Sequence, residues 1–164
     1  MTTPIQIRIA SASDLDSICK LSEQINHQHH EYVQDIFVEL ADNLRERAFW
    51  QTAMEAPNSA IFLACANQAV LGFISLRWTE DTANPFLCVR KICRIGTIVV
   101  ADHQHQQGIG KLLMDAATAW GREHRTVEMR LEVFDFNRNA LAFYEHLGFS
   151  VQTHIMRKLM GETE

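Results

Sequence analysis

Apolar and polar residues alternate at the start of the chain and then take up a helical spacing. Isoleucines occupy every second position over residues 5–9, which predicts a half-buried strand. Ser13 precedes two aspartates and is a candidate N-cap for a helix that we expect to end near Asn26. A histidine-rich stretch interrupts that helical pattern. A second helical region is expected over residues 33–54, followed by a turn at residues 57–59.

The middle of the chain has the pattern of strands. Two apolar runs, residues 60–66 and 69–78, are joined by the polar pair at residues 67–68 and predict a hairpin. After a polar loop, a longer strand is expected over residues 86–100. Gly96 lies inside this strand and is a candidate β-bulge, because glycine is otherwise unfavourable in a strand interior.

The last third of the chain alternates between helix and strand. Apolar residues from Ile109 to Trp120 lie on one helical face, and a strand is expected over residues 127–134. A helix over residues 137–147 and a final strand over residues 149–159 complete the pattern. The order β-α-α-β-β-β-α-β-α-β predicts one domain of the α/β or α+β class, residues 1–164, with a mixed sheet.

Composition and charge argue against several classes of protein. Apolar residues make up 47% of the chain and charged residues 21%, which is ordinary for a soluble globular domain. The apolar runs are too short to span a membrane, and the first residues do not resemble a signal peptide, so a cytoplasmic location is expected. The net charge is −5, and there is no basic stripe of the kind that binds nucleic acid.

Cysteines and histidines do not predict a metal site or a disulfide. The four cysteines lie in apolar segments and form no CxxC pair, so we expect them to be reduced. The histidines lack the spacing of a helical zinc pair. No metal is therefore expected.

A glycine pair marks the passage from the long strand to the following helix. Gly108 and Gly110 follow a β-branched apolar run and precede an amphipathic helix, and the backbone N–H groups of residues 106–111 could converge there on a diphosphate. A nucleoside-triphosphate loop is excluded because Leu112 replaces the hydroxyl residue. A dinucleotide fingerprint is excluded because Leu113 replaces the third glycine. A tight turn without a ligand is the alternative.

A second segment makes the pattern specific. Asn137 and Tyr144 are two helical turns apart, so they lie on one helix face. Residues 105–110 match the spacing of [RQ]-x-x-G-x-[GA], and the segment from Asn137 matches N-x-x-A-x-x-x-Y-x-x-x-G-F. Together these segments resemble the GNAT superfamily of acetyl-CoA-dependent N-acetyltransferases. The opening segment, residues 7–21, is similar to that family's first strand and helix.

The resemblance implies a GNAT-like fold, with a central, mostly antiparallel sheet whose central strands splay apart and are flanked by helices. It implies transfer of an acetyl group from acetyl-CoA to a primary amine. Direct transfer in a ternary complex is expected, because no cysteine lies at the loop to carry the acetyl group. A non-catalytic acyl-CoA sensor and a protein N-terminal or lysine acetyltransferase are the alternatives. Similar proteins are commonly dimers, so the resemblance is compatible with a homodimer.

The resemblance also implies roles for single residues. The backbone of Ile98 and Val100 would pair with the pantetheine arm, and Asn137 would bind that arm near the thioester. Tyr144 would protonate the leaving thiolate, since a phenol with a pKa near 10 stays protonated at pH 7. His105 stands where the family has Arg or Gln, which leaves open whether its side chain reaches the diphosphate. The residues assigned to the loop are His105, Gln106, Gln107, Gly108, Ile109, Gly110 and Lys111.

The general base and the acceptor are less well defined. Glu132 is a candidate base and would share a strand face with Glu128, although both could equally be solvated or paired with arginine. Similar proteins line the acceptor site with residues that follow the first helix, which makes His29, His30 and Tyr32 candidate substrate contacts.

Acidic residues bear on the class of acceptor. Glu31, Asp35 and Glu39 recur every four positions and would share one face if this segment were helical. Such a face is either solvated or attracts a cation. On the second interpretation, the acceptor is a small cationic amine.

Overall fold

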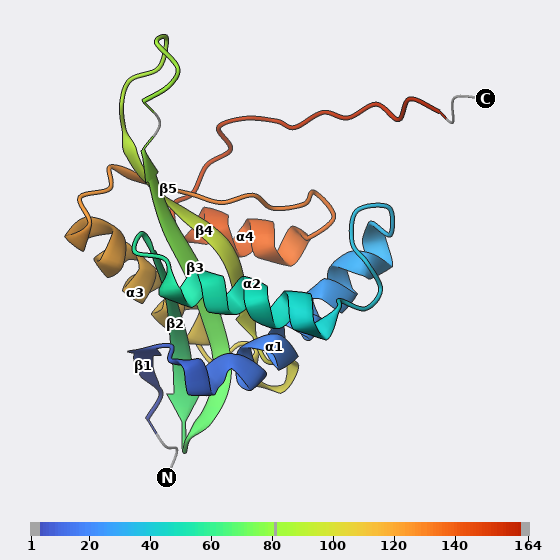
Figure 1. The fold of residues 1–164 in the computed structure, drawn as a ribbon, viewed down its shortest axis with the longest axis vertical. Coiled ribbons are helices and arrows are strands. Elements are labelled where there is room, and N and C mark those ends of the chain that lie inside the picture. The colour runs from blue at the N-terminus through green and yellow to red at the C-terminus, as the bar shows by residue number, and fades with distance from the viewer. Residues whose placement is uncertain (1–3, 81, 162–164) are drawn as a thin grey trace. The chain divides into compact units, whose positions relative to one another are not determined.

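The structure is a computed structural model that describes residues 4–80 and 82–161. The described residues form one five-stranded sheet in the order β1-β2-β3-β4-β5, antiparallel from β1 to β4 and parallel between β4 and β5 (Figure 1). The strands are β1 (Gln6–Ile9), β2 (Ser59–Ala66), β3 (Ala69–Glu80), β4 (Lys91–Val100) and β5 (Glu128–Arg130). The helices are α1 (Leu15–Tyr32), α2 (Asn43–Glu55), α3 (Ile109–Glu123) and α4 (Arg138–His146). This is the mixed α/β architecture with a mostly antiparallel sheet that the sequence predicts.

The chain forms two compact units, Met1–Glu132 and Val133–Glu164. The sheet and helices α1, α2 and α3 belong to the first unit, and α4 belongs to the second. A single domain over residues 1–164 stays a prediction.

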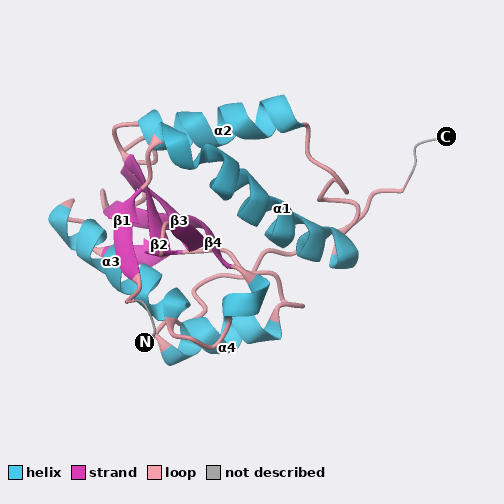
Figure 2. Cartoon of the chain, turned by 90° about the horizontal axis from the view of Figure 1, so that it is seen from below, coloured by secondary structure: helices cyan, strands magenta, loops and turns pink. Residues whose placement is uncertain are grey.

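Helices cover both faces of the sheet in the first unit. Helices α1 and α2 lie on one side and α3 on the other (Figure 2). Alternate strand residues point to opposite faces, so one set meets α1 and α2 while the other meets α3. The core on the α1 and α2 side is formed by Leu15, Ile18, Cys19, Leu21, Trp50, Ile61, Leu63, Cys65, Phe73, Val99 and Ala101. The buried residues of α3 include Ile109, Leu113, Met114, Ala117 and Trp120.

Helix α1 begins differently from the prediction. Ser11, not Ser13, caps a short 3₁₀ turn that leads into α1 at Leu15. The carboxylate of Asp14 accepts hydrogen bonds from the backbone N–H of Ser11 at 2.8 Å and from the Arg8 guanidinium at 2.7 and 2.8 Å. The N-cap prediction was wrong because Asp14 points back to Arg8 on β1, a partner that the local pattern does not reveal.

Helix α1 also continues through the histidine-rich stretch and ends at Tyr32 rather than near Asn26. Histidine does not break a helix, and the ring Nδ1 of His29 lies 2.7 Å from the carbonyl oxygen of Ile25, one turn earlier. The second helical region starts at Asn43, where the Asp42 side chain accepts a hydrogen bond from the N–H of Arg45, and not at residue 33. Residues 33–42 form turns instead.

The hairpin and the bulge are confirmed. Asn67 and Gln68 both have positive φ, 49° and 67°, as the tight turn between β2 and β3 requires. The register of β3 with β4 passes from the Ser75–Thr97 pair to a pair between the next residue of β3 and Ile95, which leaves Gly96 as the extra residue. Strand β4 starts at Lys91, five residues later than predicted.

The predicted final strand over residues 149–159 is wrong. Residues 151–161 contain no helix or strand. A strand forms only where a neighbouring strand supplies backbone partners, and α4 is the one regular element among residues 133–161. The strand predicted over residues 127–134 is likewise reduced to the three residues of β5.

Candidate functional site

Strand β4 has an open edge next to the glycine loop. It pairs with β3 over its whole length, but with β5 only from Ile92 to Arg94. Ala101 donates its N–H to the carbonyl of Leu71 at 2.8 Å. Residues of an antiparallel strand bond alternately to its two sides, so this bond fixes which residues face β3. Residues 98 and 100 therefore direct their backbone N–H and C=O groups away from β3, toward the side where no strand of the described chain pairs with them. This is the splay that the resemblance implies.

The carbonyl of Val100 already has two donors at this edge. It accepts a hydrogen bond from Nε2 of Gln24 at 3.0 Å and lies 2.9 Å from Nε2 of His105. A carbonyl can only accept, so Nε2 of His105 carries the hydrogen. The His105 ring is thus directed back to the strand end. No pattern in the sequence singles out Gln24, because its partners lie 76 and 78 residues away along the chain.

The loop after β4 presents backbone amides at the start of α3. Gln106 and Gly108 both have positive φ, 63° and 77°. The N–H of Leu112 is bonded to the carbonyl of Gly108 at 3.1 Å, so the three amides before it have no acceptor inside the helix. Successive N–H groups in such a turn, together with the helix dipole, form an anion-binding arrangement.

One side chain of the loop anchors it to the core. Ile109 is buried in the core, with 1% of its surface exposed, while Gln106 and Gln107 are exposed. The Lys111 ammonium pairs with Asp115 at 2.7 Å, one turn along α3. A Cβ added to Gly108 would meet no atom within 4 Å, so the left-handed backbone, rather than crowding by the protein, requires glycine here.

Helix α4 in the second unit carries the other two predicted residues. Asn137 is the N-cap of α4, and its Oδ1 accepts a hydrogen bond from the N–H of Ala140 at 3.1 Å. Burial raises the pKa of Tyr144 to about 12. The Tyr144 ring packs against Phe143 and Phe149, with ring centroids 5.4 and 5.7 Å apart. The phenol therefore stays protonated throughout the neutral range.

The structure corrects the expected placement of the candidate base. Strand β5 contains Glu128 but ends at Arg130, so Glu132 lies beyond it and the two glutamates do not share a strand. Glu128 is bonded to Arg130 and, at 2.5 Å, to Arg90. These hydrogen bonds, from Arg130 first, lower the pKa of Glu128. A carboxylate held in this way is a poor proton acceptor, whereas Glu132 is exposed.

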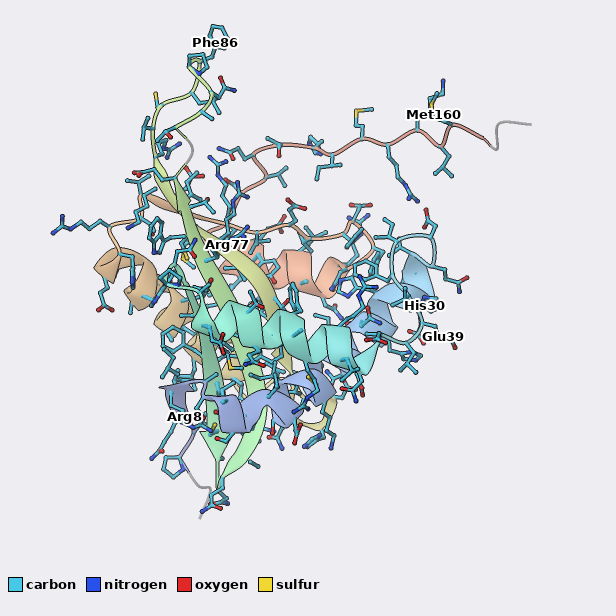
Figure 3. All side chains as sticks on the ribbon, in the orientation of Figure 1. Arg8, His30, Glu39, Arg77, Phe86 and Met160 are labelled. Carbon is cyan, nitrogen blue, oxygen red and sulfur yellow. The ribbon has the colours of Figure 1, made fainter. Side chains whose placement is uncertain are left out.

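An acid-lined groove of about 380 Å³ lies between α1, α2 and the connection that joins them. Its carboxylates belong to Glu23, Glu39 and Glu46. Among the described residues, none of the three forms an ion pair. Glu39 lies on the connection and is labelled in Figure 3. Phe49 and Trp50 add an aromatic wall. The other lining residues are Ser22, Asn26, His27, Leu40 and Ala41. The groove can hold a small organic cation. Of its three glutamates, only Glu39 belongs to the acidic residues at positions 31, 35 and 39 that the sequence pattern indicated.

Residues 22–149 identify the family of this chain. The sequence model of the Acetyltransferase (GNAT) family matches residues 22–149, more than three quarters of the chain. The chain belongs to the GNAT family. No curated protein matches the sequence significantly.

Solved structures share the GNAT fold over nearly the whole chain. A variant of the BH1408 protein from Bacillus halodurans is 25% identical, with a TM-score of 0.89 over 94% of this chain and 99% of that chain. The aminoglycoside N-acetyltransferase AAC(6')-Iy, in complex with a CoA-containing bisubstrate analogue, is 19% identical, with a TM-score of 0.78 over 97% and 99%. An aminoglycoside acetyltransferase from an uncultured soil metagenomic sample, in complex with trehalose, is 17% identical, with a TM-score of 0.69 over 97% of each chain.

The predicted acceptor contacts of this GNAT protein lie at the end of α1. Tyr32 is its last residue, and Nδ1 of His30 lies 2.7 Å from the carbonyl oxygen of Phe37. The His29 ring packs against the ring of Phe37 in a tilted arrangement, with the centroids 4.8 Å apart. The predicted acidic helix face is wrong, because α1 ends before residue 35 and Glu31 pairs with His27 at 3.6 Å.

Three further properties concern the described residues of the GNAT chain. Its four cysteines are free, and burial raises the pKa of Cys93 to about 11. No group of three or more His, Cys, Asp or Glu that could hold a metal ion occurs in residues 4–80 and 82–161. Within the same residues, no helix has both the length and the apolar character needed to cross a membrane.

Proposed function

We propose that this protein transfers the acetyl group of acetyl-CoA to a primary amine. The observation that carries the proposal is the open edge of β4, which runs directly into an amide-lined turn at the start of α3. An extended arm can pair with the backbone of Ile98 and Val100 as an added strand, while the diphosphate accepts hydrogen bonds from the amides of residues 106–111. Relatives solved with CoA or a CoA conjugate support this ligand.

The chemistry requires three proton movements besides the transfer itself: two away from the acceptor nitrogen and one onto the sulfur. The acceptor ammonium loses a proton to a base or to water, and the free amine attacks the thioester carbonyl carbon. A carbon–nitrogen bond forms, the carbon–sulfur bond breaks, and the sulfur takes a proton from Tyr144. The attached nitrogen loses its second proton, which returns through solvent to the Tyr144 phenolate. Asn137 holds the arm near the thioester. Glu132 remains the candidate base, as an exposed carboxylate that is in no ion pair of the described residues.

Direct transfer in a ternary complex requires no acetyl-enzyme. A cysteine carrier would need a thiolate, whereas burial keeps Cys93 as a thiol and no cysteine lies in the loop. We further propose a cytoplasmic location and allow for a homodimer.

We propose a small cationic amine as the acceptor, such as a polyamine or an amino sugar. Three glutamates of the α1–α2 groove have no cationic partner among the described residues, so an ammonium group is electrostatically favoured there. Two structural relatives are aminoglycoside acetyltransferases, which supports the same class. The groove volume of about 380 Å³ suits a small molecule rather than a folded protein surface.

The proposal is tested by incubating the protein with acetyl-CoA and a panel of polyamines, aminoglycosides, amino acids and peptides. We expect time-dependent release of free CoA together with an acetylated cationic amine, identified by mass spectrometry. Acetylation of peptides alone would contradict the acceptor class. Tight acetyl-CoA binding without turnover of any amine would favour the acyl-CoA sensor.

The groove has a separate kinetic test. Glu46→Gln removes one half-buried carboxylate of the groove with little change in shape. We expect the KM of the cationic amine to rise several-fold, while the KM of acetyl-CoA is unchanged. The matched control is Glu55→Gln, at the end of the same helix and outside the groove. Equal kinetics for Glu46→Gln and wild type would remove the groove from the acceptor site.

A further inference from the structure

Three segments of the first unit meet at the end of β4. Gln24 of α1 donates from Nε2 to the carbonyl of Val100 at 3.0 Å, and its Oε1 accepts a hydrogen bond from the N–H of Asp102 at 3.2 Å. His105, from the loop, approaches the same carbonyl at 2.9 Å. One side chain of α1 therefore bonds the backbone on both sides of Ala101, where the strand becomes the loop.

The chemistry of this contact requires an amide side chain. A carboxamide carries a donor and an acceptor on one carbon, so Gln24 can satisfy a C=O and an N–H at the same time. A glutamate would accept from Asp102 but would repel the oxygen of Val100. From the opposite side, the buried Ala101 is bonded through its N–H to Leu71. The strand end is thus held from β3 and from α1 together.

The contact also limits which backbone groups the open edge offers. Both acceptor positions of the Val100 carbonyl are taken, by Gln24 and by His105. At this part of the edge, the N–H and C=O of Ile98 and the N–H of Val100 are left for a ligand.

We infer that Gln24 is a positioning residue for acetyl-CoA. It fixes the end of β4 and the first residue of the loop, and it confines pairing of the pantetheine arm to Ile98 and the N–H of Val100. The inference rests on the proposed function, because it takes acetyl-CoA as the ligand of this edge.

The experiment compares Gln24→Ala and Gln24→Glu with Gln28→Ala. Gln28 is an exposed glutamine one turn later on α1, without any hydrogen bond among the described residues, and is the matched control. Binding of acetyl-CoA and of adenosine 3′,5′-bisphosphate, which lacks both the arm and the diphosphate, is measured by calorimetry. Thermal unfolding and the KM and kcat of the acetyl transfer are measured on the same proteins.

We expect Gln24→Ala to weaken acetyl-CoA binding about tenfold, as the loss of two hydrogen bonds predicts. Gln24→Glu should weaken it further, because the added charge lies beside the diphosphate loop. The KM of acetyl-CoA should follow its affinity while kcat stays within about threefold of wild type. In Gln24→Ala, binding of adenosine 3′,5′-bisphosphate should not change, and Gln28→Ala should behave as wild type.

Several results would overturn the inference. Unchanged acetyl-CoA affinity in Gln24→Ala would do so, and so would tighter binding, since Gln24 would then compete with the arm for Val100. If Gln24→Ala lost affinity for both ligands equally and unfolded at a lower temperature, Gln24 would only stabilise the fold. Wild-type protein that binds no acetyl-CoA would overturn the proposed function itself, which separates the two failures.

Discussion

At the level of single residues, Tyr144 decides whether the protein is an enzyme or a binding domain. Tyr144→Phe keeps the ring packed against Phe143 and Phe149 and removes the hydroxyl. We expect kcat to fall roughly 10²-fold, the low end for loss of a general acid, with acetyl-CoA affinity within a few fold of wild type. Steady-state rates and binding isotherms of both proteins measure this. A wild-type rate in the variant would make Tyr144 a packing residue.

The pKa of Tyr144 adds a pH dependence to the same prediction. Burial raises this pKa to about 12, so the phenol remains a proton donor up to about pH 11. Any fall in rate between neutral pH and pH 10 should therefore be the same in wild type and in Tyr144→Phe.

Gly108 tests the amide-lined turn. Its φ of 77° is strained for a β-branched residue by about 1–2 kcal/mol. Gly108→Val should weaken acetyl-CoA binding at least tenfold, about 1.4 kcal/mol, as measured by calorimetry. Asparagine tolerates this backbone, so Gly108→Asn is the control and should lose less. If both variants bind as wild type does, the turn does not hold the diphosphate.

At the level of elements, the turn before α1 depends on Asp14. Its carboxylate is buried and accepts hydrogen bonds from Arg8 and Ser11, and these bonds, from Arg8 first, hold its pKa well below the ordinary value near 4. The stabilisation is fully present above the unfolded-state pKa. It is lost as the pH falls through the lower pKa of the folded state.

Asp14→Asn should lower the free energy of unfolding at pH 7 by about 2 kcal/mol, since Arg8 is 45% exposed and solvent screens part of the pair. The difference from wild type should shrink when urea denaturation is repeated below about pH 4. The control is Asp16→Asn, which breaks an exposed pair with Arg47 and should cost less than about 1 kcal/mol. Equal losses for the two variants would contradict the role of Asp14.

The elements that the sequence predicts well have local causes. The β2–β3 hairpin follows from the polar pair at Asn67 and Gln68, and the bulge from a glycine within a strand. Helix α3 follows from an apolar stripe. The wrong elements depend on partners outside their own segment. The start of α1 depends on Arg8 of the preceding strand, and the strand expected over residues 149–159 depends on a neighbouring strand that residues 133–161 do not supply.

The residues of the candidate site also fall into those with a local signal in the sequence and those whose surroundings depend on packing. The turn at the glycine loop could be predicted because its glycines are close together in the sequence, whereas the role of Ile98 rests only on the resemblance to the GNAT family and stays a prediction. Gln24 and Glu46 could not be predicted, because each is an ordinary polar residue within a helix. Their surroundings are set by packing against β4 or against another helix. No signal in one sequence separates such residues from a solvated face.

At the level of the whole molecule, a ligand that completes the sheet should stabilise it. Acetyl-CoA at about 100 times its Kd should raise the free energy of unfolding by about 2.7 kcal/mol. For a chain of this length, that corresponds to a rise in Tm of roughly 5–10 °C, measurable by differential scanning fluorimetry. Gly108→Val should show a smaller rise at the same ligand concentration. An unchanged Tm in wild type at saturating acetyl-CoA would contradict a site at this edge.

The edge of β4 also bears on whether the protein stays monodisperse. Exposed strand edges recruit strands from other chains, and the usual remedies are short edges, bulges and covering segments. Here the bulge at Gly96 bends the strand, β5 covers its first part, and Gln24 and His105 block the carbonyl at its end. A polypeptide strand, typically five or six residues long, finds too few partners there to add stably. The slender arm of the proposed ligand has few amide groups and needs no more partners than these. If the proposed function holds, the edge accepts a small molecule while resisting aggregation.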